Sequence, residues 1–164
     1  MVRNLPPEDT RYEVLSGVSA GSINLAGLVL FEIGDELNAT QYMVDNWEPL
    51  THKNLWEFWP REFTDAFFKE SGVLDTEPLR NTLTEIMGNM TKKRKLITSA
   101  VDVASGVYTA MDWDNLTPDE YVSAVVASAS VPIAFPMTEL RGRYYMDGGT
   151  VWNTNMITAI DKCK

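Results

Sequence analysis

The chain has 164 residues, a formal net charge of -9, 45% hydrophobic residues, one cysteine and one histidine. This length suits a single domain, and the acidic balance argues against nucleic acid as a partner, because phosphate binding needs a basic surface. The single cysteine, Cys163, excludes an intramolecular disulfide, and the single histidine, His52, argues against a histidine-rich metal site.

The N-terminal part of the chain predicts a strand, a tight turn and a buried helix. Residues 11–16 are rich in β-forming side chains and run into Gly17, which is typical of a strand that ends in a turn. From Ala20 onward, apolar residues occupy nearly every face, which predicts a buried helix that ends near Gly34 and Asp35. This apolar stretch is too short to span a membrane, and no secretion signal precedes it. We therefore expect a cytoplasmic protein with, at most, peripheral contact at membranes.

Residues 38–59 combine polar side chains with large aromatic ones, among them Trp47, Trp56, Phe58 and Trp59. One interpretation is a small satellite core beneath irregular helices. The other is an aromatic rim that contacts an apolar ligand or a bilayer interface. The sequence leaves both interpretations open.

A second helix is expected after Asp75 or Thr76, either of which can cap it, with Pro78 in its first turn. Apolar residues then recur at helical spacing and predict one buried stripe: Leu79, Leu83, Ile86, Met87 and Met90. The short basic run at 92–95 is typical of a solvated helix end.

Strand and helix signals alternate through the rest of the chain. Residues 96–103 are small or apolar almost without interruption, which predicts a strand covered on both faces. Further strands are expected over 107–113 and 143–146. Between them, Thr117 and Glu120 form a capping box that starts a helix. This order predicts an α/β fold with a mostly parallel sheet.

The clearest chemical signal is the motif Gly-Val-Ser-Ala-Gly at 17–21, between the predicted strand and helix. This is the context of a nucleophile elbow, in which a strained turn exposes the serine and its neighbours must be small. Ser19 is then the candidate nucleophile, Gly17 and Gly21 are the small neighbours, and the amide of Ala20 is a candidate oxyanion donor. A plain strand-to-helix turn is the alternative.

A serine nucleophile needs a base, and the histidine that usually supplies it must follow the acid in this kind of fold. No histidine follows Asp147, and His52 lies in a polar stretch, so a carboxylate is the remaining partner. Asp147 ends a predicted strand and precedes Gly148 and Gly149, which permit a sharp turn. An ordinary Asp-Gly turn is the alternative interpretation.

Other candidates for chemistry are weaker. The acids Asp112, Asp114 and Asp119 are spaced like a metal cluster, but Asp114 fits a turn and Asp119 a first helical turn, so we expect no metal. Cys163 has no base near it in the sequence and reads as an incidental thiol.

Three segments together resemble the patatin-like lipid acyl hydrolases: the stretch 16–24 around Ser19, the stretch 127–136 (Ala-Ser-Ala-Ser-Val-Pro-Ile-Ala-Phe-Pro), and 145–149 around Asp147. The resemblance implies a three-layer α/β fold and a Ser–Asp dyad without histidine. It implies that Ser19 attacks the acyl ester of a glycerolipid or phospholipid, that Asp147 is the base, and that no cofactor takes part.

One departure from the family stands out. The resemblance implies a glycine-rich loop that forms the oxyanion hole well before the serine, yet only eighteen residues precede Ser19. We therefore expect residues 1–164 to be a single partial domain of a longer patatin-like chain. The alternative to an active hydrolase is a catalytically silent module that binds lipid or another partner.

Overall fold

The computed structural model describes residues 4–58, 72–87 and 91–163. Trp59 and Met90 lie outside these residues. The strands of the main sheet are β1 (Val14–Val18), β4 (Lys95–Asp102), β5 (Tyr108–Asp112), β6 (Thr138–Leu140) and β7 (Arg143–Asp147), and a small second sheet pairs β2 (Glu57–Phe58) with β3 (Leu74–Asp75). The helices are α1 (Ala20–Leu28), α2 (Glu36–Trp47), α3 (His52–Leu55), α5 (Glu77–Met87), α6 (Pro118–Ala129) and α7 (Met156–Lys162), with short 3-10 turns η1 (Pro7–Thr10), η2 (Trp113–Asn115) and η3 (Gly148–Thr150).

The main sheet is built around β4, which pairs with β1, β5 and β7. β5 lies along residues 97–101 of β4, β1 along 95–99 and β7 along 100–102. Because β5 overlaps both of the others, it takes one edge of β4, and β1 and β7 share the opposite edge. The carboxyl end of β1 therefore meets the carboxyl end of β7 on that edge.

The expected α/β class is confirmed, and the sheet is mixed. β1 and β4 pair in parallel, as predicted, whereas β5 and β7 pair antiparallel to β4 and β6 antiparallel to β7. For β4 with β5 and for β6 with β7 the difference has a local cause, because strands joined by a tight turn must be antiparallel. Between β6 and β7, Arg141 and Gly142 both have positive φ, at 52° and 72°, which suits a two-residue hairpin turn.

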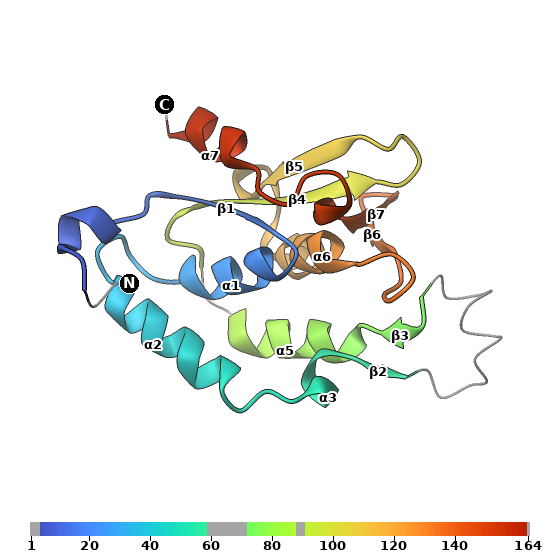
Figure 1. Cartoon of the computed structure of the whole chain (residues 1–164), viewed down its shortest axis with the longest axis horizontal. Helices are drawn as coiled ribbons and strands as arrows, with labels where there is room; N and C mark the ends of the chain where they lie inside the picture. The colour runs from blue at the N-terminus through green and yellow to red at the C-terminus, as the bar shows by residue number, and fades with distance from the viewer. Residues whose placement is uncertain (1–3, 59–71, 88–90, 164) are drawn as a thin grey trace.

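Helices cover the sheet unequally (Figure 1). α1 packs on β1 and α6 on β4, while α2 and α5 form an outer row against α1 and α6. The short α7 packs on β1 from the opposite face. The carboxyl end of β1 thus lies between the main helical layer and the segment that follows β7.

The main core lies between the sheet and this helical layer. Its members include Leu15 and Leu96 from the sheet, Leu83 from α5 and Val125 from α6. The predicted stripe on α5 is confirmed for Leu79, Leu83 and Met87, which are buried, whereas Ile86 is half-buried. The predicted capping box at the start of α6 is also present. Of the aromatic segment, Phe58 is exposed and Trp56 half-buried, so it forms no closed satellite core among the described residues.

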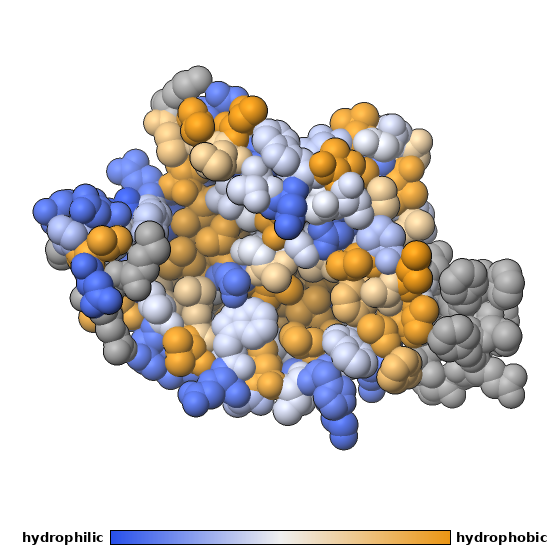
Figure 2. All heavy atoms as spheres, viewed as in Figure 1, coloured by the Kyte–Doolittle hydropathy of each residue, from blue (hydrophilic) through white to orange (hydrophobic). Residues whose placement is uncertain are grey.

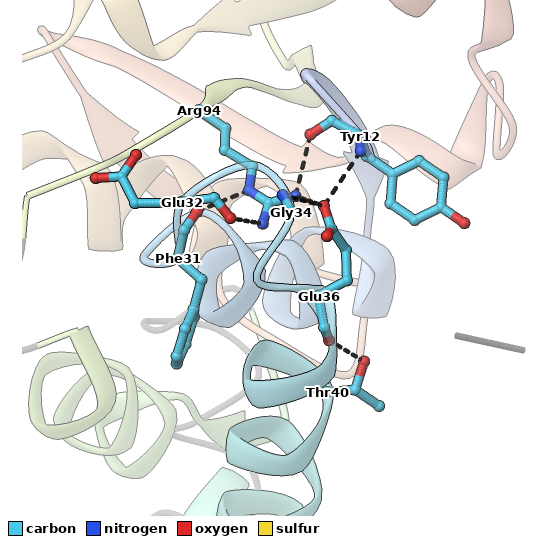
Figure 3. A network of polar contacts seen from close by, with 7 residues as sticks. All are labelled: Tyr12, Phe31, Glu32, Gly34, Glu36, Thr40 and Arg94. Atoms are coloured by element: carbon cyan, nitrogen blue, oxygen red, sulfur yellow. Dashed lines mark hydrogen bonds and ion pairs between the residues drawn. The ribbon is translucent and has the colours of Figure 1, made fainter. Parts of the chain in front are cut away.

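α1 ends at Leu28, earlier than predicted, because the chain that follows turns around Arg94 (Figure 3). Arg94 donates to the carbonyls of Phe31 at 2.7 Å, Glu32 at 2.5 Å and Tyr12 at 3.0 Å, and to Glu36 Oε1 at 2.7 Å. The expectation that the basic run is a solvated helix end is therefore wrong for Arg94. Its guanidinium is buried and ties β1, α1 and α2 together.

Candidate active site

Ser19 lies in the turn that joins β1 to α1. Its backbone has φ 56° and ψ -130°, a positive-φ conformation that costs energy for any residue other than glycine. Ser19 is the N-cap residue of α1, yet its hydroxyl does not cap the helix. The amide of Ala20 lies in the first turn of α1, where no carbonyl of the same helix can accept it. A strained strand-to-helix turn of this kind is typical of a nucleophile elbow.

The two glycines that flank Ser19 have different surroundings. A methyl group at Gly17 would lie 2.9 Å from the backbone of Gly21 and 2.9 Å from Leu25 Cδ1. A methyl group at Gly21 would meet nothing within 4 Å. The motif predicts that both residues must be small, but the structure gives a steric reason for Gly17 alone.

This asymmetry predicts opposite effects of the same substitution. We expect Gly17→Ala to destabilise the protein by about 1–3 kcal/mol, because the added methyl must displace backbone. Gly21 lies within α1, so we expect Gly21→Ala to be neutral or to stabilise by up to about 1 kcal/mol. Urea unfolding followed by circular dichroism measures both. A loss in Gly21→Ala as large as that in Gly17→Ala would contradict the asymmetry.

Asp147 ends β7 directly beside the end of β1. On the shared edge of β4, Val18 pairs with Ser99, and Asp147 pairs with Ala100, the next residue along. Consecutive residues of a strand are about 3.3 Å apart, so the two strand ends are neighbours. Asp147 is 4% exposed. The fold thus brings the ends of the two predicted motifs together.

The turn after Asp147 crosses over the end of β1. A methyl group at Gly148 would lie 2.5 Å from the Ser99 carbonyl oxygen and 3.0 Å from Val18 Cγ1, so the glycine permits this close approach. The amide of Gly149 donates to Asp147 Oδ1 at 2.7 Å. This bond is the turn interaction expected of an Asp-Gly pair, and it also fixes one carboxylate oxygen beside the elbow.

The side chain of Asp147 leaves the sheet on the same face as α6. Tyr145, two residues earlier on β7, packs against Ala124 and Ala127 of α6, and side chains alternate along a strand. The amide of Asp147 donates to the carbonyl of Ser130, at the end of α6, at 2.8 Å. α1 starts at Ser19 and packs on this same face of the sheet, in contact with α6.

Ser128 also lies in this region, although no sequence pattern predicted a specific role for it. It lies on α6 and is fully buried, and its hydroxyl accepts the amide of Ser19 at 3.0 Å. The only sequence signal was its place in the segment 127–136 that resembles the family. Neither periodicity nor composition distinguishes it from the other small residues of α6.

A second carboxylate on the paired strands β4 and β7, that of Asp102, makes structural hydrogen bonds. Asp102 Oδ2 accepts from Arg143 Nη1 at 2.8 Å, and Oδ1 accepts from the amide and hydroxyl of Ser105. The Arg143 guanidinium and these Ser105 bonds lower the pKa of Asp102 to about 2. Asp102 is therefore ionised at neutral pH and fully occupied, which leaves Asp147 as the carboxylate beside Ser19.

The remaining sequence candidates lie elsewhere. His52 opens α3, is exposed and packs against Trp56, and Figure 1 shows α1 and α5 between α3 and the elbow. Asp112 caps η2 and pairs with Lys162, while Asp114 lies in that turn and Asp119 in the first turn of α6, as predicted. Cys163 is an exposed free thiol. Within residues 4–58, 72–87 and 91–163, no three His, Cys, Asp or Glu side chains gather in a way that could hold a metal ion.

The helical side of the fold carries two apolar hollows. One, of about 20 Å³, lies between α1, α2 and α5, and Ile23 and Gly27 of α1 line it. The other, of about 270 Å³, lies beside the loop after α6, and Ser130, Ile133 and Met146 line it. Figure 2 shows apolar side chains exposed over this loop and over α7. Apolar surface thus borders the candidate site on the side of Asp147, next to Met146.

The model of the family described as Patatin-like phospholipase matches residues 1–160 of the chain. A search of curated proteins found no match. Among the described residues, no helix is both long and apolar enough to cross a bilayer.

Proposed function

Because the chain belongs to the patatin-like phospholipase family, we propose that it hydrolyses fatty acyl esters of glycerolipids with Ser19 as nucleophile and Asp147 as base. The observation that carries the proposal is the meeting of the two strand ends: the strained turn at Ser19 and the buried carboxylate of Asp147 occupy neighbouring positions on one edge of β4. The chain's single histidine lies on α3, so a carboxylate has to act as the base.

In the proposed reaction, Ser19 Oγ attacks the ester carbonyl while its proton passes to Asp147. Oδ1 is bound to the amide of Gly149, so we assign proton transfer to Oδ2. The tetrahedral intermediate places its negative oxygen at the start of α1, where the amide of Ala20 and the helix dipole favour negative charge.

The intermediate collapses as the ester bond breaks, and the proton on Asp147 passes to the departing alcohol. An acyl-enzyme on Ser19 remains. A water molecule then attacks the acyl carbonyl and gives its proton to Asp147. The fatty acid leaves, the proton returns to Ser19, and both groups are restored.

The exposed apolar side chains around the site support a lipid substrate. The described residues include exposed Val131 and Met137 beside the second hollow, and Met156, Ile157 and Ile160 on α7. A soluble protein gains nothing by exposing a contiguous apolar patch unless something covers it. We propose that the protein is cytoplasmic and that this surface contacts a lipid aggregate transiently, which would place it at membrane surfaces during turnover.

A fluorophosphonate probe tests the proposed chemistry directly. We expect covalent labelling of Ser19, identified by mass spectrometry of the modified peptide, together with hydrolysis of a p-nitrophenyl acyl ester. Binding to phosphatidylcholine vesicles without labelling would instead support the silent lipid-binding module. Labelling at a serine other than Ser19 would overturn the assignment of the nucleophile.

Ile133 offers a test of the lipid contact. Its side chain is 72% exposed and contributes nothing to the core. Its backbone φ is 73°, a conformation that is strained for a β-branched residue. Asparagine tolerates this conformation, so we expect Ile133→Asn to unfold at the same or a higher temperature. We also expect it to lower turnover of phospholipid vesicles at least about fivefold, the loss of about 1 kcal/mol of apolar contact, with unchanged turnover of soluble p-nitrophenyl butyrate.

The comparison of the two substrates is the control for this variant. A parallel fall on both substrates would mean that Ile133 acts on the active site rather than on lipid contact. An unchanged rate on vesicles would exclude Ile133 from the contact surface.

A further inference from the structure

Ser128 joins three separate elements behind the elbow. From α6, its hydroxyl lies 3.0 Å from the Ser19 amide nitrogen, 2.8 Å from Ser22 Oγ on α1 and 2.6 Å from the carbonyl oxygen of Ser99 on β4. Ser22, Ser99 and Ser128 are all fully buried. The bonds from Ser128 to Ser22 and Ser99 are therefore buried away from solvent, and the bond to the Ser19 amide is partly buried.

The directions of the three bonds follow from the capacity of each group. A carbonyl oxygen only accepts, so the Ser128 hydroxyl proton must go to Ser99. An amide only donates, so Ser128 accepts from Ser19. The single proton of Ser128 is then used, and Ser22 must donate to Ser128. Ser128 thus makes one donor and two acceptor interactions, which is its full capacity.

This arrangement bears on the strained turn. A positive φ at Ser19 persists only if surrounding contacts hold it. The bond from its amide to Ser128 fixes the peptide on one side of Ser19, and the bond from Ser128 to Ser99 anchors that peptide to β4. The Ser19 amide is also withheld from any substrate, so oxyanion contacts at the elbow must come from amides further into α1.

We propose that Ser128 is a positioning residue that holds the nucleophile elbow in its strained, reactive conformation. The inference rests on the proposed function, because it assigns Ser128 a part in the reaction of Ser19. Ser128 does not touch the substrate, and its effect passes through the backbone of Ser19. A displacement of the nucleophile by about 1 Å is enough to lower turnover about 100-fold.

The test is Ser128→Ala in the 164-residue chain, with Thr98→Val as a matched control. Thr98 is fully buried on β4 and accepts from Trp113 Nε1 at 3.2 Å, so the control also deletes one buried hydroxyl. We expect Ser128→Ala to lower kcat and the rate of fluorophosphonate labelling about 100-fold, with KM nearly unchanged. The control should keep both rates within about threefold while losing thermal stability.

Amide hydrogen exchange at Ser19, measured by NMR, reports on the hydrogen bond without requiring activity. We expect its protection to fall in Ser128→Ala while the amides of β4 keep theirs. Equal labelling rates in Ser128→Ala and wild type, or unchanged protection at Ser19, would overturn the inference. If wild type itself is not labelled, the proposed function fails, and the exchange result alone decides whether Ser128 holds the elbow.

Discussion

Replacement of Ser19 by alanine is expected to abolish hydrolysis, leaving only the background rate of ester cleavage. The variant lacks the oxygen that forms the acyl-enzyme, and loss of a serine nucleophile elsewhere lowers turnover by about a million-fold. The hydroxyl does not cap α1, so its removal costs the helix no hydrogen bond. Hydrolysis of a p-nitrophenyl ester and labelling by a fluorophosphonate probe measure the loss, and a melting curve like that of wild type shows that the fold is intact. Activity that survives Ser19→Ala would exclude the proposed mechanism.

Asp147→Asn completes this prediction. The asparagine oxygen can still accept from the amide of Gly149, so the turn and the fold should persist. The amide cannot take up the proton of Ser19, and we expect a fall of about 10⁴-fold in turnover. Because the two residues act as one unit, the double variant should be no less active than Ser19→Ala alone.

Asp112→Asn is a closely matched control for Asp147→Asn. Asp112 also ends a strand, also precedes a 3-10 turn, and its Oδ1 accepts an amide from Asp114 at 3.0 Å, much as Asp147 accepts from Gly149. It differs in position, because it ends β5 on the far edge of β4. Unchanged activity in Asp112→Asn, beside the loss in Asp147→Asn, would separate catalysis from turn formation. Equal losses in both would support the interpretation of Asp147 as an ordinary turn residue.

The sequence predicted those parts of the fold that depend on neighbouring residues. The strand-to-helix turn at Ser19, the capping box at Thr117 and the buried strand β4 each follow from a pattern within about ten residues, and each is present. The mixed sheet was not predicted, because strand patterns do not give the direction in which strands pair, as for β5 on β4, and because β6 is only three residues long with Arg141 in its hairpin turn.

Features that depend on distant residues were missed for a common reason. The end of α1 and the burial of Arg94 are set by bonds between segments about sixty residues apart in the chain. The role of Ser128 depends on a partner 109 residues away. Periodicity and turn propensity report local preference and solvent exposure, and they carry no information on which serine of a small-residue helix faces a strained turn.

The buried ion pair of Glu36 and Arg94 is expected to make a large contribution to the free energy of unfolding. The Arg94 side chain is 0% exposed and that of Glu36 4% exposed. Burial alone would raise the pKa of Glu36, but hydrogen bonds from its own backbone amide, from Arg94 and from Gly34 outweigh it, and the net effect lowers the pKa. Glu36 is therefore ionised in the folded protein, and its removal would leave the Arg94 charge without its partner.

We expect Glu36→Ala to lower the free energy of unfolding by about 3–5 kcal/mol, the cost of breaking a buried ion pair on one side. The neighbouring pair of Lys93 and Glu32 is the control, since these side chains are 42% and 70% exposed, and Glu32→Ala should cost less than about 1 kcal/mol.

The folded pKa of Glu36 lies below its unfolded value, which sets the sign of the pH dependence of stability. The contribution of Glu36 is complete above its unfolded pKa and is lost as the pH falls through the folded value. Urea unfolding of wild type and both variants at neutral and acidic pH measures each effect. We expect the difference in the free energy of unfolding between wild type and Glu36→Ala to become smaller as the pH falls. A difference that stayed constant, or a Glu32→Ala loss as large as that of Glu36→Ala, would show that Arg94 is held mainly by the backbone carbonyls around it.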